Sequence, residues 1–547
     1  MEGTQPESSF CDVVIVGNGP SALILSFILH GNVPYYDPDH PHPDPILDNK
    51  LKHASHLLQL DIDSLTDHFG ASRFSYSSQA LPVNSLIDSL VRPHGETDEP
   101  EAAPCIKWRY EPERAVSHVV LGDAVHPGGQ WTELPPGTAW DIQSLSYAGM
   151  LSLPGYSFYE HHLKSRGSPM PPYTRPSRRE IADYLAAYPE SVGINHSIKT
   201  HEKVSEVSRT ADGFYIGSHS IHCKRLVLAS GIFTEVKPAR PLLQPLLGIL
   251  SQPKTPAKEK APLLVIGSGF SAADVIISAA PDQKIIHIYK WEPEANPSPL
   301  RNCHLQAYPE YAGVYRLMKR GALAKIDPTL SSEKPTHSIP TLKSPSPFLK
   351  SREWEHVYET FPNTLVTGVK VEGPDAIVTL FCSLDGSTVT RRVSGLSYAV
   401  GRRGSLQYLD KAVQREILGD NANNNPDALI AKDTLRSSAF NDLQIAKDVF
   451  IIGSLTGDSL IRFAYGGCFY VAGKLVGDAN TAGTACKGIG NGCTPQPAKL
   501  SNGFAKTNGF NRNASGATQN PALVSPAHDT NGNPPGKKNR SWWNFWF

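Results

Sequence analysis

Two segments of the chain join an apolar run, closely spaced glycines and a second apolar run. The first reads DVVIVGNGPSALILSFIL at 12–29, and the second reads APLLVIGSGFSAADVIISAA at 261–280. A β-strand that turns through glycine into a helix presents free N–H groups and the positive end of the helix dipole to phosphate oxygens. Because the pattern occurs twice, the sequence predicts two dinucleotide-binding sites in one chain.

The residues of the first turn have separate tasks in such a site. Gly17 permits the tight turn, Gly19 lets the backbone approach a pyrophosphate, and Ala22 takes the place of a third glycine and keeps helix and strand close. A carboxylate for a ribose hydroxyl is expected about 20 residues later. Asp37, which ends the apolar run 33–36, is the predicted residue.

The second turn is followed by a different type of side chain. The apolar run 285–289 ends in Lys290, where the first unit ended in an aspartate. A cation there suits a 2′-phosphate, whereas a carboxylate suits a bare ribose. This difference predicts NADP(H) at the second turn and FAD at the first, although Lys290 as a solvated lysine at a strand end stays an open alternative. The glycine and small residues of the second turn are Gly267, Gly269, Ser271 and Ala272.

Composition limits the kind of protein. With 52 Lys and Arg against 52 Asp and Glu, no net charge attracts nucleic acid or an anionic membrane. The eight cysteines are scattered, and residues 1–11 contain no Lys or Arg of a secretory signal, so we expect an intracellular, cytoplasmic protein. The glycines and proline at 17–20 argue against a membrane span at 12–29.

The order of these segments predicts an α/β fold of two nested Rossmann-like domains. Apolar runs that end in small residues, at 226–231 and 396–401, are typical of strands that carry the chain between two such domains. The expected domains are a discontinuous FAD-binding domain, an inserted NADPH-binding domain and a disordered tail, at 10–240 with 376–478, 255–375 and 479–547.

Two irregular regions complete the layout. Within the insertion 38–118 of the first domain, we expect 38–92 to be partly helical and to cover the substrate side, and 93–104 to be exposed. The tail ends in KKNRSWWNFWF, from Lys537 to Phe547, which could dock on a membrane surface or a protein partner.

Gly128-Gly129-Gln130-Trp131 is a further candidate cofactor motif. Paired glycines let the backbone lie against a flavin diphosphate or ring, and Trp131 supplies a flat wall. A glycine hairpin beside a core tryptophan is the alternative. Histidines 40, 42, 53, 56 and 68 match no zinc spacing, so no metal site is predicted.

Taken together, these motifs resemble flavin-dependent monooxygenases with two dinucleotide-binding domains, and more narrowly the oxidative stress-induced growth inhibitor family. The resemblance runs in order from about residue 12 to 478. The segments that carry it are VVIVGNGPSALILSFILHGNVPYY, HVVLGDAVHPGGQW, REIADYLAAY, LLVIGSGFSAADVI, YPEYAGVYRLM and IIGSLTGDSLIRFAYGGC.

The resemblance implies a reaction and a set of cofactor contacts. NADPH reduces the flavin, O2 is captured as a flavin hydroperoxide, and one oxygen passes to a small-molecule substrate, in a protein linked to control of growth or cell division. No side chain is assigned as catalytic, because the cofactor carries the chemistry. Gly466 and Gly467 could offer N–H groups to the reduced flavin. The implied FAD contacts are Gly17, Gly19, Pro20, Ser21, Ala22, Asp37, Gly128, Gly129, Trp131, Gly457 and Asp458, and the implied NADPH contacts are Gly267, Gly269, Ser271, Ala272 and Lys290.

Two alternatives remain beside this interpretation. The larger monooxygenase group carries a Phe-x-Gly-x-x-x-His element before its second glycine turn, whereas residues 241–262 contain no histidine, so reduction by NADPH could be slow or absent. A regulatory protein that keeps FAD, or only the fold, without turnover is therefore the main alternative. A disulfide reductase would need paired cysteines near the flavin, and the near pair here, Cys486 and Cys493, lies in the tail.

Overall fold

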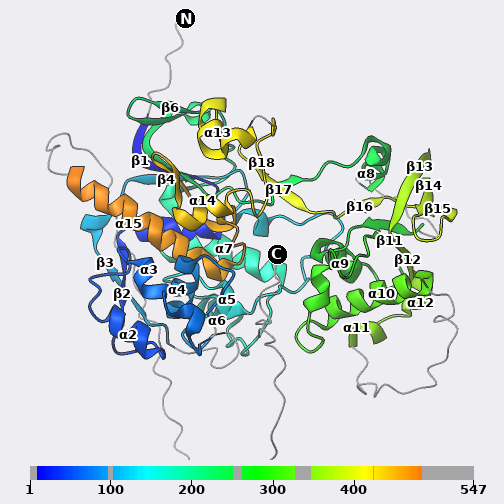
Figure 1. Cartoon of the computed structure of the whole chain (residues 1–547), viewed down its shortest axis with the longest axis horizontal. Helices are drawn as coiled ribbons and strands as arrows, with labels where there is room; N and C mark the ends of the chain where they lie inside the picture. The colour runs from blue at the N-terminus through cyan, green and yellow to red at the C-terminus, as the bar shows by residue number, and fades with distance from the viewer. Residues whose placement is uncertain are drawn as a thin grey trace, which may run out of the picture.

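The computed structural model of the 547-residue chain describes residues 9–74, 76–95, 103–250, 261–326, 347–422 and 424–482. Most of 93–104 and the tail from residue 483, with its aromatic end at 537–547, lie outside the described residues. The described chain forms two lobes (Figure 1). The first lobe contains both ends of the described chain, and the second is built from the middle, which Figure 1 colours green to yellow-green.

The first lobe is centred on a mostly parallel sheet with the order β19-β20-β8-β1-β4-β5. The strand β1 lies in its middle, parallel to β4 on one side and to β8 on the other. Its residues from Val13 to Val16 are buried, as expected for a continuous apolar run in a sheet covered on both faces. The strands are β1 Ser9–Val16, β4 His118–Leu121, β5 Ile198–Lys199, β8 Ile221–Leu228, β19 Gln444–Ala446 and β20 Val449–Ile451, and β6 Val207–Thr210 and β7 Gly213–Ile216 extend the sheet next to β8.

The strand that follows the first glycine turn is not part of this sheet. We expected 33–36 to return beside β1, but β2 (Asn32–Tyr36) instead pairs antiparallel with β3 (Ile106–Tyr110) in a separate ribbon. Pro34 in its middle cannot donate a hydrogen bond to a neighbouring strand, which favours an edge or ribbon position over a central one. The place beside β1 is taken by β4, more than 80 residues later in the chain.

Helices cover the first sheet and contribute to the insertion. Helix α1 leaves β1 at its buried end, and α15, the last described helix, packs against α1 and against α4 of the insertion. The insertion is partly helical, which confirms that expectation. The helices of this lobe are α1 Pro20–Leu29, α2 Pro45–Leu51, α3 Ile62–Thr66, α4 Pro82–Val91, α5 Ala148–Leu151, α6 Phe158–Arg166, α7 Arg178–Ser191, α13 Lys411–Leu418, α14 Arg436–Asn441 and α15 Ala464–Ala482.

The second lobe contains a four-stranded parallel sheet with the order β12-β11-β10-β16. An antiparallel sheet, β13-β14-β15, packs its buried side chains against it. The elements are α8 Gln244–Leu250, β10 Leu263–Ile266, α9 Phe270–Ser278, β11 Ile285–Tyr289, α10 Pro309–Ile326, α11 Pro347–Lys350, α12 Trp354–Val357, β12 Tyr358–Pro362, β13 Thr364–Glu372, β14 Asp375–Cys382, β15 Thr388–Val393 and β16 Leu396–Tyr398.

The lobes are nested as the sequence predicted, but the boundary lies later than expected. Residues 376–398 were assigned to the first domain, whereas β14 and β15 pack on the second lobe and β16 pairs with β10. The chain returns through β17 (Arg402–Ser405), which pairs with β9 (Glu235–Val236) on the outgoing segment and with β18 (Leu429–Ile430). The chain leaves the first lobe after the run 226–231 and returns to it after the run 396–401, the two runs that were predicted to carry it between domains. None of the helices within the described ranges has the length and hydropathy of a membrane span.

Candidate functional site

The first glycine turn is built as the sequence predicted. Gly17 has a φ of +111°, and a Cβ atom there would lie 2.4 Å from the carbonyl oxygen of Ala229 on the neighbouring strand. Gly19 caps α1, and Pro20 opens it without needing a hydrogen bond at its nitrogen. The N–H groups of the first turn of α1, which have no partner within the helix, are thus held at the end of β1.

The Gly128–Trp131 motif lies against this turn. The N–H of Gly128 donates to the carbonyl of Asn18 at 2.8 Å, and a Cβ on Gly129 would lie 3.2 Å from the Cα of Gly19. The two backbones therefore touch, and a side chain at Gly129 would crowd this contact.

Arg178, the first residue of α7, holds the loop that contains Trp131. Its guanidinium lies 5.6 Å from the centre of the Trp131 ring and donates to the carbonyls of Gln130 and Glu133. Burial lowers the pKa of Arg178, while the charge of Asp274 opposes the shift. No sequence motif had pointed to this arginine, which directly precedes the REIADYLAAY segment at 179–188.

A cavity of about 410 Å³ opens in front of the two touching loops. This volume lies in the range of small-molecule and cofactor sites. Of the predicted FAD contacts, the cavity brings together Gly17, Gly19, Pro20, Ser21, Gly128, Gly129, Trp131 and Asp458. Ala22 is buried beneath it and contacts no cavity space, as expected of a residue that packs helix on strand.

Asp37 does not line this cavity. Its carboxylate binds His40 at 3.0 Å and the N–H of Asp39 at 3.2 Å, at the end of β2. Burial is the largest single effect and raises the pKa of Asp37. The hydrogen bonds from His40 and Asp39, together with the nearby charge of Lys107, outweigh it and hold the pKa below its usual range.

Another carboxylate occupies the position that Asp37 was predicted to fill. Val16 pairs with Leu121 of β4, so Asp123 lies two residues past the last pair, at the rim of the cavity. Lys290 lies two residues past the pair of Ile266 with Ile288 in the second lobe. Asp123 and Lys290 are therefore equivalent in register, and the run HVVLGD is the sequence signal that could have identified Asp123.

Asp458 faces the cavity but its carboxylate already has protein partners. One oxygen accepts from the N–H of Leu81 at 2.8 Å and from the side chain of Asn84 at 2.7 Å, and the other pairs with Arg436 at 2.7 Å. Gly457 next to it makes room for Arg436, since a Cβ would lie 2.7 Å from its Cδ. These two residues join α4, α14 and the last helix.

Gly466 and Gly467 also serve this junction instead of lining the cavity. A Cβ on Gly466 would lie 2.4 Å from the carbonyl of Val83, and the N–H of Gly467 donates to the side chain of Asn84 at 2.8 Å. Their predicted contact with a flavin is not what the structure shows, because α4 of the insertion occupies their side of α15. Ala464, at the start of that helix, does line the cavity.

The residues present fit an FAD molecule. The hydroxyl of Ser459, which lines the cavity, is buried with no hydrogen-bond partner within the described chain. Such a group is expected to bind a polar atom of a ligand or a water molecule. A Cβ on Gly19 would meet nothing within 4 Å, so the space in front of the helix N-terminus is open to a phosphate.

The second glycine turn repeats the first in its backbone. Gly267 has a φ of +151°, and a Cβ would lie 2.2 Å from the carbonyl of Ala399, directly after β16. The fully buried His287 donates from Nε2 to the carbonyl of Gly267 at 2.7 Å and accepts at Nδ1 from the hydroxyl of Tyr358 at 2.6 Å. Burial lowers the pKa of His287 to about 4, so the ring is neutral and holds the turn through one defined tautomer.

The other predicted residues of this turn lie as expected on the strand and helix. Gly269 caps α9, Ala272 is buried against Gly267, and Ser271 is exposed in the first turn of the helix. Lys290 is exposed and forms an ion pair of 2.9 Å with Glu292. Both its nucleotide role and its role as a solvated lysine are compatible with this placement.

The two lobes are held together by a buried arginine. Arg175 pairs with Glu310 of α10 at 2.5 Å and donates to the carbonyl of Ala307 at 2.9 Å and to that of Ser144 at 2.6 Å. Its guanidinium lies 4.8 Å from the centre of the Tyr308 ring. These contacts fix the second lobe against the segment that follows the Trp131 loop.

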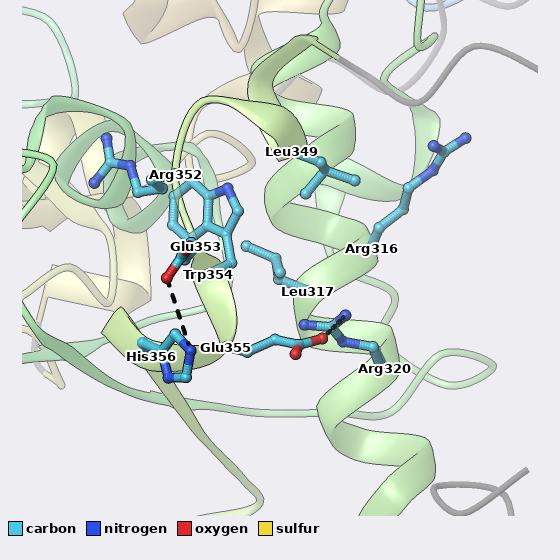
Figure 2. A pocket seen from close by; sticks show the side chains of 9 residues that line it. All are labelled: Arg316, Leu317, Arg320, Leu349, Arg352, Glu353, Trp354, Glu355 and His356. Atoms are coloured by element: carbon cyan, nitrogen blue, oxygen red, sulfur yellow. Dashed lines mark hydrogen bonds and ion pairs between the residues drawn. The ribbon is translucent and has the colours of Figure 1, made fainter. Parts of the chain in front are cut away.

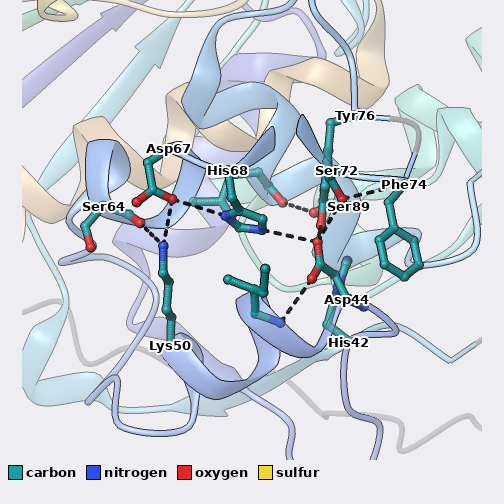
Figure 3. A network of polar contacts seen from close by, with 12 residues as sticks. His42, Asp44, Lys50, Ser64, Asp67, His68, Ser72, Phe74, Tyr76 and Ser89 are labelled. Carbon is teal, nitrogen blue, oxygen red and sulfur yellow. Dashed lines mark hydrogen bonds and ion pairs between the residues drawn. The ribbon is translucent and has the colours of Figure 1, made fainter. Parts of the chain in front are cut away.

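Two histidines of the insertion, His42 and His68, belong to a polar network around Asp44 (Figure 3). The buried carboxylate of Asp44 accepts from Tyr76 at 2.8 Å, His68 at 3.1 Å and Ser72 at 3.2 Å. These hydrogen bonds lower its pKa although burial, the largest effect, raises it. Within the described ranges, no group of three or more His, Cys, Asp or Glu side chains is arranged to hold a metal ion.

Comparison with known proteins identifies relatives over most of the chain. No protein-family model matches it. Oxidative stress-induced growth inhibitor 1 from Homo sapiens is 26% identical over 512 residues, which cover 85% of this chain and 94% of the human protein. An oxidative stress induced growth inhibitor homolog from Caenorhabditis elegans is 23% identical, over 87% of this chain and 96% of its own length.

Among solved structures, a flavin-containing monooxygenase from Stenotrophomonas maltophilia is similar in fold, with a TM-score of 0.46 and 14% identity. The match covers 86% of this chain and 99% of that protein. The sequence relatives confirm the resemblance that the motifs indicated: the chain is similar to the oxidative stress-induced growth inhibitor family over about 85% of its length.

Proposed function

We propose that the protein is an FAD- and NADPH-dependent monooxygenase that acts on a small-molecule substrate with O2. The observation that carries this proposal is the first-lobe cavity, where the glycine turn at the N-terminus of α1 meets the Gly128–Trp131 loop. The second strand–glycine–helix unit, in a lobe inserted into the first, supports a separate nicotinamide nucleotide.

The cavity residues divide FAD binding between them. The N–H of Ser21 at the start of α1 would bind the diphosphate, Asp123 would accept from a ribose hydroxyl, and the Ser459 hydroxyl would meet a polar atom of the cofactor. When bound, FAD supplies hydride acceptance and reaction with O2.

The surrounding chain supplies orientation and a closed wall. Arg178 holds the Trp131 loop through two backbone carbonyls and lies 5.6 Å from the centre of the Trp131 ring, which fixes the loop beside the cavity. Asp458 holds α4 of the insertion over the last helix, which shields that side of the cavity from water. For NADPH, the turn at Gly267 and Gly269 would bind the diphosphate, and Lys290 the 2′-phosphate.

The relatives' names favour a second candidate function. A growth inhibitor could keep FAD as part of its fold and act through binding, without turnover. Of the six cysteines in the described ranges, none lines the first-lobe cavity, so a flavin–disulfide reductase finds no support there.

One experiment separates these candidates. The purified full chain is examined for flavin absorption. NADPH is then added without oxygen, to follow flavin bleaching, and under air, to follow NADPH oxidation and peroxide. The monooxygenase proposal predicts a yellow protein whose flavin is bleached without oxygen and which consumes NADPH under air. A yellow protein that NADPH cannot bleach favours the regulator, and a colourless protein that binds no added FAD contradicts the monooxygenase and leaves a regulator that keeps only the fold.

The segment before the second turn makes this test informative. Residues 241–262 lack the histidine of the larger group, and 251–260 lie outside the described residues. If flavin reduction is slow at saturating NADPH, then that missing element limits the reaction. A low rate caused only by a high KM would instead indicate weak nucleotide binding at the second turn.

A further inference from the structure

A second cavity lies in the inserted lobe, between α10 and the short helices α11 and α12 (Figure 2). Its volume is about 560 Å³, again in the range of small-molecule sites. No residue of either glycine turn lines it.

The cavity lies at the opposite edge of the second sheet from the nucleotide turn. Helix α12 ends at Val357 and leads directly into β12, which runs parallel to β11 and β10. The cavity is therefore at the amino ends of these strands, whereas Gly267 follows the carboxyl end of β10. A ligand here would not overlap a nucleotide bound at Gly267.

The floor of the cavity is apolar and firmly packed. Trp354 is 4% exposed and donates from its indole nitrogen to the carbonyl of Phe348 at 3.2 Å. Leu317, from the facing side of α10, is 4% exposed, and Leu349 lies beside it. These side chains offer a flat, apolar surface to an aromatic ring.

The carboxylates that line the cavity already have partners. Glu355 pairs with Arg320 at 3.4 Å, and Glu353 pairs with His356 at 3.7 Å. Glu355 thus has an arginine partner, whereas His356 balances the charge of Glu353 only when its ring is protonated.

Two arginines remain without a carboxylate. Arg316 forms no ion pair or hydrogen bond with any part of the described chain. Arg352 lies 4.6 Å from the centre of the Trp354 ring, donates to the carbonyl of Ala280 at 3.3 Å, and has a buried Nε with no partner among the described residues. Figure 2 shows Arg316 and Arg352 on opposite sides of the apolar floor.

We propose that this cavity binds a small aromatic carboxylate, with its ring over the apolar floor of Trp354 and the two leucines and its negative charge attracted by Arg316 and Arg352, which flank that floor. A guanidinium binds a carboxylate through paired N–H donors, and an aromatic ring gains most where the floor is already dry and rigid. This proposal does not depend on the redox function proposed above.

The test uses the purified full chain and 6-fluoro-2-naphthoate as the probe, followed by ¹⁹F NMR. We expect saturable binding of the probe and at least about tenfold weaker binding of the neutral 6-fluoro-2-naphthamide. Addition of FAD and NADP⁺ should leave the probe bound, whereas displacement by either nucleotide would place the probe in a nucleotide site and overturn the proposal.

Variants locate the probe in this cavity. Arg316→Glu, at an exposed position, and Arg352→Gln, which keeps a planar group against Trp354, should each weaken naphthoate binding at least about tenfold. The matched control is Arg392→Glu, since Arg392 is 56% exposed on β15 of the same lobe, and it should change affinity less than about twofold. Wild-type affinity in both cavity variants, or no saturable binding at all, would refute the site.

Discussion

The two glycine turns share a sequence pattern but are completed by different kinds of neighbour. In the second lobe, β10, α9 and β11 follow one another directly and β11 pairs with β10, so the residue after β11 is Lys290. In the first lobe, the strand after α1 leaves the sheet, and β4 pairs with β1 instead. The same register position is then held by Asp123.

The difference teaches what a spacing rule measures. The side chain about 20 residues after a glycine turn lies beside that turn only where the next strand in sequence is also the next strand in space. The strand before Lys290 meets this condition, and the strand before Asp37 does not. Four changes test the comparison between the two turns, from the largest expected effect to the smallest.

Gly19→Glu should abolish FAD retention. The new side chain extends into open space, so the fold is kept, but its carboxylate enters the region proposed for the diphosphate. Affinity for FAD should fall about 100-fold or more, or about 2.7 kcal/mol. The measurement is flavin content after gel filtration with a titration of added FAD. The matched change in the other lobe, Gly269→Glu, should keep FAD and lose reduction by NADPH, so equal flavin loss in both variants would contradict the assignment.

Asp123→Ala should weaken FAD binding about 20-fold, because a charged hydrogen bond to the ribose is lost. Asp37→Ala should change it less than about twofold, since Asp37 lies away from the cavity and its carboxylate binds His40 and the N–H of Asp39. Isothermal titration of the apoproteins with FAD compares the two. The reverse order of effects would restore Asp37 as the ribose ligand.

Lys290→Glu should raise the KM for NADPH about tenfold and leave that for NADH within about twofold, because the 2′-phosphate alone meets the new charge. Lys284→Glu is the control, since Lys284 is also exposed and flanks the other end of β11. Initial rates with both nucleotides give the four constants. If NADPH and NADH respond alike, then Lys290 is only a solvated lysine.

Asp274→Asn should stabilise the protein slightly at neutral pH. Burial raises the pKa of Asp274 on α9 to about 6, against a hydrogen bond from Tyr311 and the charge of Arg178. A raised pKa in the folded state means that stability is present below the unfolded value near 4 and is lost as the pH rises through 6. The variant should therefore gain about 1 kcal/mol at pH 7.5, after discounting for partial exposure. Thermal melts at pH 7.5 and 4.5 check this: the gain should be clearly smaller at pH 4.5, and a gain equally large at both pH values would exclude the ionised carboxylate as its cause.

Much of the fold followed from local patterns. The buried run at Val13–Val16, the turn at Gly17 and the helix after Pro20 are each set by residues within a few positions of one another, and the second turn is equally local. The crossing at 396–401 was also foreseen. The end of the second lobe, predicted at 375 but found after β16, was not, because β14 and β15 carry an alternating pattern that does not say which sheet they cover.

Parts of the candidate site could not be read in this way. Gly466 and Gly467 look like residues for close approach to a ligand, yet they admit α4, which lies almost 400 positions earlier in the chain. Arg178 and Ser459 have no motif of their own. Pro34 was the residue that indicated that β2 would not enter the sheet that contains β1.

The sequence alone determined that the chain has two strand–glycine–helix turns, because the φ angles of glycine and the burial of short apolar runs act over a few residues. Only the tertiary structure decided which strand lies beside each turn. Closing a longer loop costs little additional entropy, so the insertion before β4 barely penalises its pairing with β1. Packing and hydrogen bonding between distant strands, which no local pattern encodes, then placed Asp123 at the cavity and Asp37 away from it.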